Sequence, residues 1–239
     1  RIEKTAPKPE DEETEIPVQT NATAPKKDDD EAVIAKIATL EKYTDFSNVP
    51  MDKKTMLAKI SVVIDEYIEE YHLDAITLRC WNEMETILRV CPCVLLSELN
   101  DRGITASCEI DMCSAITMRA MALASEGATA VLDWNNNYGD DENKVILFHC
   151  GPVAQKLMSA KGKVVDHPMF AKALGPGCSF GCNVGFMRPM DFTFISTTTV
   201  DGKMRFYSGE GEFTDAPLGE GKDIDTRYLN TARNELTKG

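Results

Sequence analysis

The sequence predicts an α/β protein: a Rossmann-like domain with a parallel sheet, followed by an antiparallel, β-rich, barrel-like domain. Between Ile104 and Cys150 a short apolar run, an amphipathic segment and a second apolar run follow one another, the order of a βαβ unit. Later, two β-branched segments joined by Asp201-Gly202 indicate an antiparallel hairpin. We therefore expect residues 31–150 to form the α/β domain and residues 151–239 the β-rich domain, which we expect to be incomplete.

The segments before this βαβ pattern are assigned by composition and periodicity. Residues 1–30 are rich in proline and acidic residues, which predicts an acidic connector. Apolar residues recur at helical spacing from Asp30, and a second amphipathic helix is expected from Asp52 to Tyr71. The β-branched run 75–80 then predicts a strand, and residues 92–100 predict another helix.

Composition excludes several classes of partner. The 239 residues are 43% hydrophobic, enough for a substantial core, and carry a net charge of -13. This acidic balance argues against binding to nucleic acid or to an anionic membrane surface, which both need a basic footprint. The chain has no apolar run of the roughly 18 residues needed to span a bilayer and no signal-peptide pattern at its beginning.

The eight cysteines allow two readings. Several of them lie inside apolar segments, where a free thiol behaves as a small hydrophobe, and this predicts reduced thiols and a cytoplasmic location. Alternatively, Cys91, Cys93, Cys178 and Cys182 could form a zinc or redox site. Their spacing does not repeat as two C-x-x-C pairs, so it supports zinc only weakly.

Three side chains follow consecutive apolar runs of the central segment. Glu109 ends the first run, Asp133 the second and His149 the third. If the first two runs are neighbouring parallel strands, they lie about 4.8 Å apart, and their carboxyl ends are where open α/β sheets bind ligands. Two carboxylates and an imidazole suit a divalent ion such as Mn²⁺. The alternative is that these carboxylates only cap the helices that follow them.

Polar and aromatic residues also follow the strand expected over residues 75–80. Arg79, Trp81 and Asn82 lie at its carboxyl end, so we expect them to contact a ligand, with Glu83 nearby. The alternative for Trp81 is that its ring packs on the sheet as a structural contact.

Four segments resemble the L-fucose isomerase-like family, which includes the more distant arabinose isomerases. They are LRCWNEM (78–84), LNDRGITASCEIDMCSAITMRAM (99–121), LDWNNNYGDDENKVILFHCG (132–151) and MRFYSGEGEFTD (204–215). The resemblance covers roughly residues 30–215, and CEID, LDW and FHCG are its most specific motifs.

The resemblance implies an oligomeric aldose–ketose isomerase built from α/β domains and a carboxyl-terminal β-barrel-like domain, with manganese bound between domains. Glu109 and Asp133 match the family's metal-binding carboxylates, and His149 resembles a histidine ligand of the arabinose branch. Members of the family carry a further α/β domain ahead of this region and commonly a late histidine, whereas no histidine follows His167 here. We therefore expect a central-to-late segment of such an enzyme, and whether it is active by itself stays open.

The sequence thus predicts a metal-dependent sugar isomerase that acts through a cis-enediol and assembles as a homo-oligomer. Glu109 and Asp133 would move the protons, and which carboxylate is the base stays open. The alternative function is a non-catalytic sugar- or metal-binding protein of the same fold.

Overall fold

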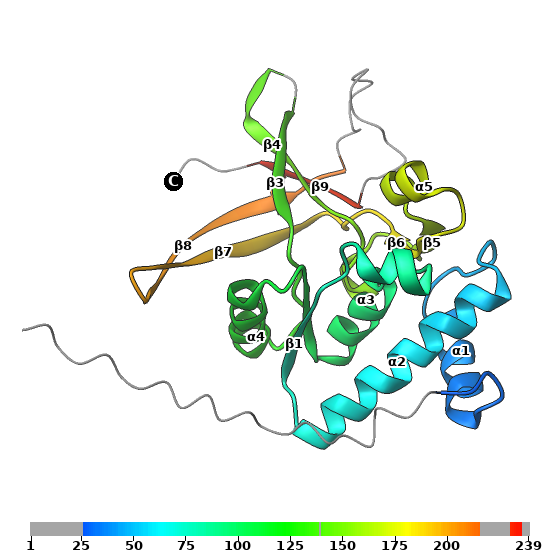
Figure 1. Cartoon of the computed structure of the whole chain (residues 1–239). Coiled ribbons are helices and arrows are strands. Elements are labelled where there is room, and N and C mark those ends of the chain that lie inside the picture. The colour runs from blue at the N-terminus through cyan, green and yellow to red at the C-terminus, as the bar shows by residue number, and fades with distance from the viewer. Residues whose placement is uncertain (1–25, 139, 216–229, 236–239) are drawn as a thin grey trace, which may run out of the picture.

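The computed structural model describes residues 26–138, 140–215 and 230–235, so most of the expected acidic connector lies outside the described residues (Figure 1). The helices are α1 (Glu31–Tyr43), α2 (Met51–Tyr71), η2 (Met84–Leu88), α3 (Cys93–Arg102), α4 (Met112–Ser125), η3 (Gln155–Leu157) and α5 (Pro168–Leu174). The strands are β1 (Ala75–Leu78), β2 (Thr105–Cys108), β3 (Asp133–Tyr138), β4 (Asp141–His149), β5 (Lys163–Asp166), β6 (Phe180–Val184), β7 (Met190–Val200), β8 (Lys203–Phe213) and β9 (Asn230–Glu235). None of the described helices is both long and apolar enough to cross a bilayer.

The strands form three sheets. β1 and β2 pair in parallel, β5 and β6 pair antiparallel, and five strands form an antiparallel sheet in the order β3-β4-β9-β8-β7. The expected mixed α/β class is confirmed, but the described strands form no closed barrel and the parallel sheet has only two strands. Because β3 and β4 precede residue 150 and β7 to β9 follow it, the largest sheet joins segments of both expected domains.

One expected strand is absent from the described structure, and this changes the topology. Residues 129–132 form no strand, and β3 begins at Asp133 and pairs antiparallel with β4 in a hairpin. The expectation that Asp133 ends a parallel strand beside Glu109 is therefore wrong. A short apolar run indicates that a segment is buried, but it does not indicate which strand the segment pairs with. Here the chain after residue 132 forms β3, which pairs with β4, its near neighbour in the sequence.

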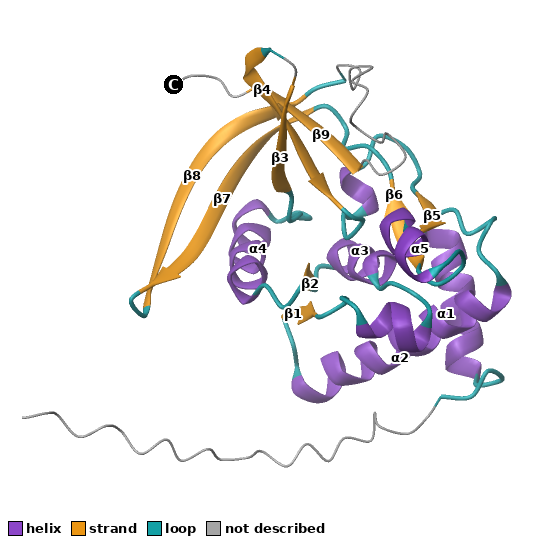
Figure 2. Ribbon diagram, turned by 45° about the horizontal axis from the view of Figure 1, so that its top comes forward, coloured by secondary structure: helices purple, strands orange, loops and turns teal. Residues whose placement is uncertain are grey.

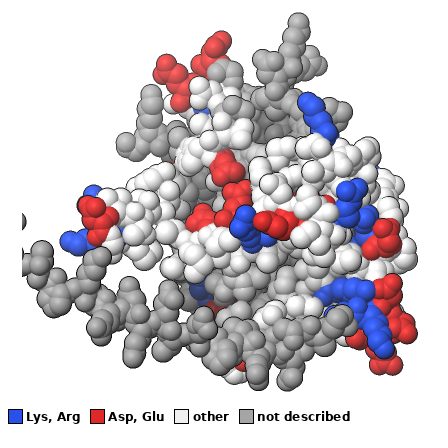
Figure 3. Space-filling view, in the orientation of Figure 1, with Lys and Arg blue, Asp and Glu red and all other residues white. Residues whose placement is uncertain are grey.

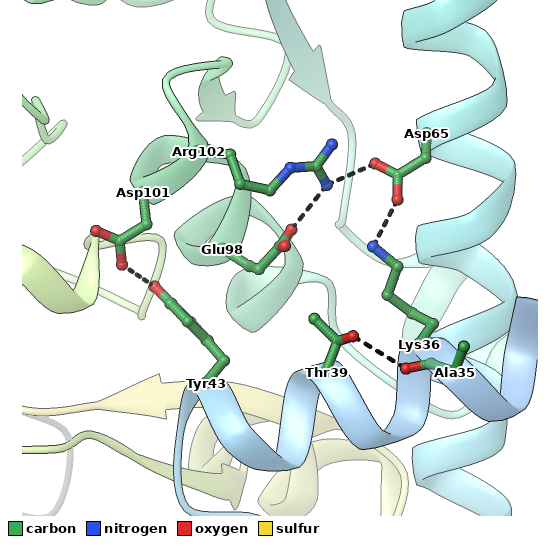
Figure 4. A network of polar contacts seen from close by, with 8 residues as sticks. All are labelled: Ala35, Lys36, Thr39, Tyr43, Asp65, Glu98, Asp101 and Arg102. Atoms are coloured by element: carbon green, nitrogen blue, oxygen red, sulfur yellow. Dashed lines mark hydrogen bonds and ion pairs between the residues drawn. The ribbon is translucent and has the colours of Figure 1, made fainter.

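The helices α1, α2 and α3 contribute buried side chains to one apolar cluster, and we call these three helices the helical layer. Asp30 caps α1 by accepting a hydrogen bond from the amide of Ala32. Figure 4 shows how charged side chains connect the three helices. Arg102 contacts Asp65 at 2.7 Å and Glu98 at 3.2 Å, and Lys36 contacts Asp65 at 2.5 Å. One carboxylate on α2 therefore joins α1 to α3.

The hairpin of β7 and β8 extends past α4 and away from α1, α2 and α3 in both views (Figures 1 and 2). Asp201 and Gly202 turn at φ 51° and 70°, which confirms the expected Asp-Gly turn. Phe194 lies opposite Gly209, where a Cβ atom would meet the ring at 2.7 Å, so only glycine leaves room for this aromatic side chain. α4 packs beside β7.

Candidate functional site

The carboxyl ends of the two parallel strands open into a pocket of about 540 Å³. Leu78 of β1 is the register partner of Cys108 of β2, so the residues that follow the two strands emerge side by side. The pocket is lined by five residues that all come from these two exits: Arg79, Trp81, Asn82, Glu109 and Ile110. The structure thus brings Glu109 together with the three residues expected to contact a ligand.

The β1 exit positions an arginine and a tryptophan. Arg79 Nε donates to the carbonyl oxygen of Trp81 at 3.2 Å, and its Nη2 contacts Glu83 Oε1 at 3.3 Å. The Trp81 ring meets Phe170 of α5 edge-to-face at 5.2 Å, yet 40% of the residue stays exposed. Trp81 therefore has a structural contact and also a surface that faces the pocket.

The β2 exit holds Glu109 on a tight turn. Glu109 and Ile110 both have positive φ values, 62° and 58°. This conformation costs free energy for any residue other than glycine, and most for a β-branched one such as Ile110. The cap of α4 is Asp111, whose Oδ1 accepts from the amide of Ser114 at 2.8 Å. Glu109 is therefore not the capping carboxylate, and its exposed side chain is available to the pocket.

Asp133 and His149 form a separate pair. His149 Nδ1 lies 3.2 Å from Asp133 Oδ2, the histidine being 5% exposed and the Asp133 side chain 62% exposed. They stand at the first residue of β3 and the last of β4, which antiparallel pairing places at the same end of the hairpin. Neither residue lines the pocket of Glu109.

Two thiols connect the pocket to this pair. Cys108, the neighbour of Glu109, shares a hydrogen bond with Cys150, the neighbour of His149. Cys80, which precedes Trp81, has its Sγ 3.2 Å from the Sγ of Cys108. The hydrogen bond with Cys150, together with burial, raises the pKa of Cys108 to about 12, so this thiol stays neutral and packs as an apolar group. The ends of β1, β2 and β4 therefore meet at a small cluster of thiols.

The cysteine-based alternative gains no support. All eight cysteines are free. Cys91, Cys93 and Cys182 share one buried cluster, whereas Cys178 donates to the carbonyl oxygen of Phe170. In the described part of the chain no three His, Cys, Asp or Glu side chains are grouped closely enough to hold a metal ion.

Sequence reasoning missed Glu85, which lies on η2, three residues after the pocket residue Asn82. Its side chain is fully buried, and among the described residues neither carboxylate oxygen has a hydrogen-bond partner in another residue. Burial raises the pKa of Glu85 to about 7. The glutamate lies in the polar stretch WNEMET without apolar periodicity, so no sequence signal distinguished it from a surface residue.

Acidic side chains are prominent on the face drawn in Figure 3. They gather around a hollow in the middle of this face, with a basic side chain among them. The pocket of Glu109 carries both signs of charge, since it is lined by one arginine and one glutamate. Such a site can hold a polar ligand by hydrogen bonds and charge.

Fold and pocket together define an α/β protein with a polar ligand pocket at the carboxyl end of a parallel strand pair. No protein-family model matches the chain. The chain is similar to the sulfoquinovose isomerase of Priestia aryabhattai, with 28% identity over 154 residues, or 64% of this chain and 34% of the relative. Two further sulfoquinovose isomerases match: that of Clostridium sp. (strain MSTE9), 26% identical over 64% of this chain and 34% of the relative, and that of Alkalicoccus urumqiensis, 28% identical over 54% and 29%.

The matched part of the chain thus spans about a third of the length of these curated relatives. Their names place them among sugar isomerases, the class that the sequence resemblance implied.

Proposed function

We propose that this chain supplies part of the active site of an aldose–ketose isomerase that converts a sulfonated sugar through a cis-enediol. One observation carries the proposal: Glu109, the carboxylate of the CEID motif, lies in the same pocket as Arg79, Trp81 and Asn82. The similarity to sulfoquinovose isomerases supports the reaction type and the substrate class.

The proton transfers can be assigned to residues of the chain. Glu109 is exposed in the pocket and held on a strained turn, so it is suited to move the proton between C2 and C1 of the open-chain sugar. Asp133 is paired with His149, and such a pair can accept and return the hydroxyl proton. Trp81 offers an apolar face to the sugar ring carbons and Asn82 a hydrogen-bonding amide, which together orient the substrate.

Manganese dependence is part of the proposal. Glu109, Asp133 and His149 offer the oxygen and imidazole donors that Mn²⁺ accepts. As they are placed in the described part of the chain, no three such side chains are grouped closely enough to hold an ion. When bound, the ion would polarise the sugar carbonyl and stabilise negative charge on the neighbouring oxygens.

Assembly and location complete the proposal. We place the protein in the cytoplasm, in keeping with its eight free cysteines. We further propose a homo-oligomer, because α4 carries exposed apolar side chains, with Ile116 51% and Leu123 63% exposed, that a second subunit would cover.

The decisive experiment is turnover of sulfoquinovose in D₂O by the purified protein, with and without Mn²⁺. The base that removes the C2 proton to form a cis-enediol can exchange that proton with solvent, so the product ketose should carry deuterium at C1. Glu109→Gln removes the proton acceptor and should lower turnover by about 10²- to 10⁴-fold. It should also weaken manganese binding, which titration of the metal measures independently.

The control is Glu142→Gln, the same change at an exposed position outside the pocket, which should leave turnover unchanged. Undiminished turnover by Glu109→Gln would contradict the assignment of Glu109. Turnover without deuterium incorporation would mean that the transferred hydrogen does not exchange with solvent, as in a direct hydride shift or a fully shielded proton transfer, and would remove this support for the enediol. Sugar binding without any turnover would favour the non-catalytic alternative.

A further inference from the structure

Arg79 is the only lysine or arginine among the described residues that line the pocket. The other charged group there is the carboxylate of Glu109, and the protein as a whole carries a net charge of -13. An anionic substrate therefore approaches a protein that repels it on average, and it needs a local cation to bind. A neutral sugar has no such requirement.

Contacts within the described residues orient the guanidinium of Arg79 but occupy only some of its N–H donors. Contacts among the described residues occupy its Nε–H, which donates to the Trp81 carbonyl oxygen, and one Nη2–H, which contacts Glu83. Arginine has five N–H donors. Three therefore remain, two on Nη1 and one on Nη2, and these two nitrogens form the edge that grips two oxygens of one anionic group.

The contact between Arg79 and Glu83, which would compete with a bound anion, is weak. The Arg79 and Glu83 side chains are 62% and 58% exposed, and their closest atoms are 3.3 Å apart. Exposed ion pairs of this kind contribute little free energy. An anion with several oxygens can take over the free edge of the guanidinium without breaking the contact to Trp81.

We propose that Arg79 binds the sulfonate group of the substrate and thereby selects sulfonated sugars over their neutral analogues. This inference rests on the proposed function, in which Glu109 acts on the other end of the same open-chain sugar. A sulfonate, with its charge spread over three oxygens, matches the paired donors of Nη1 and Nη2. Arg79 would then be a specificity-determining residue whose contact does not depend on the reacting carbon atoms.

The test compares sulfoquinovose with quinovose, which has the same sugar skeleton without the sulfonate. We measure kcat/KM for both sugars and their Kd by calorimetry. Arg79→Gln should lower kcat/KM for sulfoquinovose by about 10- to 100-fold, the loss expected for a charge-assisted hydrogen-bonded contact. The values for quinovose should change by less than about twofold. Arg79→Lys, which keeps the charge but not the paired donors, should fall in between.

Two further variants separate anion binding from a structural role. Arg205→Gln makes the same charge change at an exposed position on β8, and it should leave the preference for the sulfonated sugar unchanged. Glu83→Gln removes the competing carboxylate, and the affinity for sulfoquinovose should stay unchanged or increase. If Arg79 served only to hold Glu83, Glu83→Gln would instead cause the same loss as Arg79→Gln.

Equal losses for both sugars in Arg79→Gln would overturn the inference while the isomerase proposal stands, because the wild-type protein still turns over sugar. A wild-type protein that neither binds nor converts either sugar would overturn the proposed function and this inference with it.

Discussion

The helical layer and the pocket region differ in whether their carboxylates have hydrogen-bonding or ionic partners. In the layer of α1, α2 and α3, Asp65 contacts both Lys36 and Arg102, so the carboxylate has partners on both neighbouring helices (Figure 4). At the pocket, Glu109 is exposed on a strained turn, and on η2, three residues after the pocket residue Asn82, Glu85 is buried without a hydrogen-bond partner in another described residue. In the helical layer the charged groups have partners. Near the pocket, Glu109 is available to a ligand, and the burial of Glu85 without a partner costs stability.

This difference indicates where the chain is organised for stability and where for binding. Residues held in unfavourable backbone conformations and carboxylates with raised pKa values are typical of functional sites, because both states are maintained at the expense of stability. The helical layer instead buries apolar side chains tightly, with Leu40, Leu57 and Leu95 each at most 1% exposed. Substitutions should therefore affect stability in the layer and activity at the pocket.

The largest expected effect on stability comes from the layer. Leu57→Ala removes a fully buried side chain from the cluster around Leu40, Phe46 and Leu95. We expect a loss of about 3–4 kcal/mol in the free energy of unfolding, since the substitution leaves a cavity. Denaturant unfolding measures this loss. Sugar affinity at a temperature where the variant is folded should stay unchanged, and a large loss of affinity would contradict the separation of the two regions.

A smaller and pH-dependent effect is expected from Glu85. Its pKa is about 7 in the folded protein against the ordinary value of 4.5, so the folded state holds this proton more tightly than the unfolded state does. Stability should therefore fall as the pH rises from about 4.5 to 7, because the folded protein must then bury a charge. Glu85→Gln removes this cost and should be more stable than the wild type by roughly 2 kcal/mol at pH 8, with little difference at pH 4.5.

The measurement is chemical denaturation of both proteins at several pH values between 4.5 and 8. Glu69→Gln, the same change at an exposed position on α2, serves as the control and should follow the wild type throughout. An identical pH dependence of Glu85→Gln and wild type would show that Glu85 is not buried as a titrating group.

The smallest effect is expected at the strained turn. Ile110→Gly places a residue without a Cβ atom at φ 58° and should raise stability by about 0.5–1 kcal/mol over Ile110→Ala, which shortens the side chain but keeps the strain. The same flexibility should loosen the position of Glu109 and lower kcat relative to the alanine variant. Thermal unfolding and steady-state kinetics on the two variants measure both effects. Equal stability of the two would mean that the turn stores no strain.

The sequence by itself determined the local elements of this protein. Helical spacing located α1, α2 and α4, and Asp201-Gly202 located the hairpin of β7 and β8, because these features depend on neighbouring residues. It also marked Arg79, Trp81, Asn82 and Glu109, since polar residues directly after apolar strands lie at a sheet edge.

Only the tertiary structure decided which of these elements pair. In the folded protein β3 pairs antiparallel with β4, and β9 lies between β4 and β8. The same fold brings Asp133 next to His149 and buries Glu85. Apolar runs carry no information on strand direction, and the burial of one carboxylate depends on elements that are distant in the chain. The pairing of strands is set by the sum of such non-local contacts, so it could not be obtained from the pattern alone.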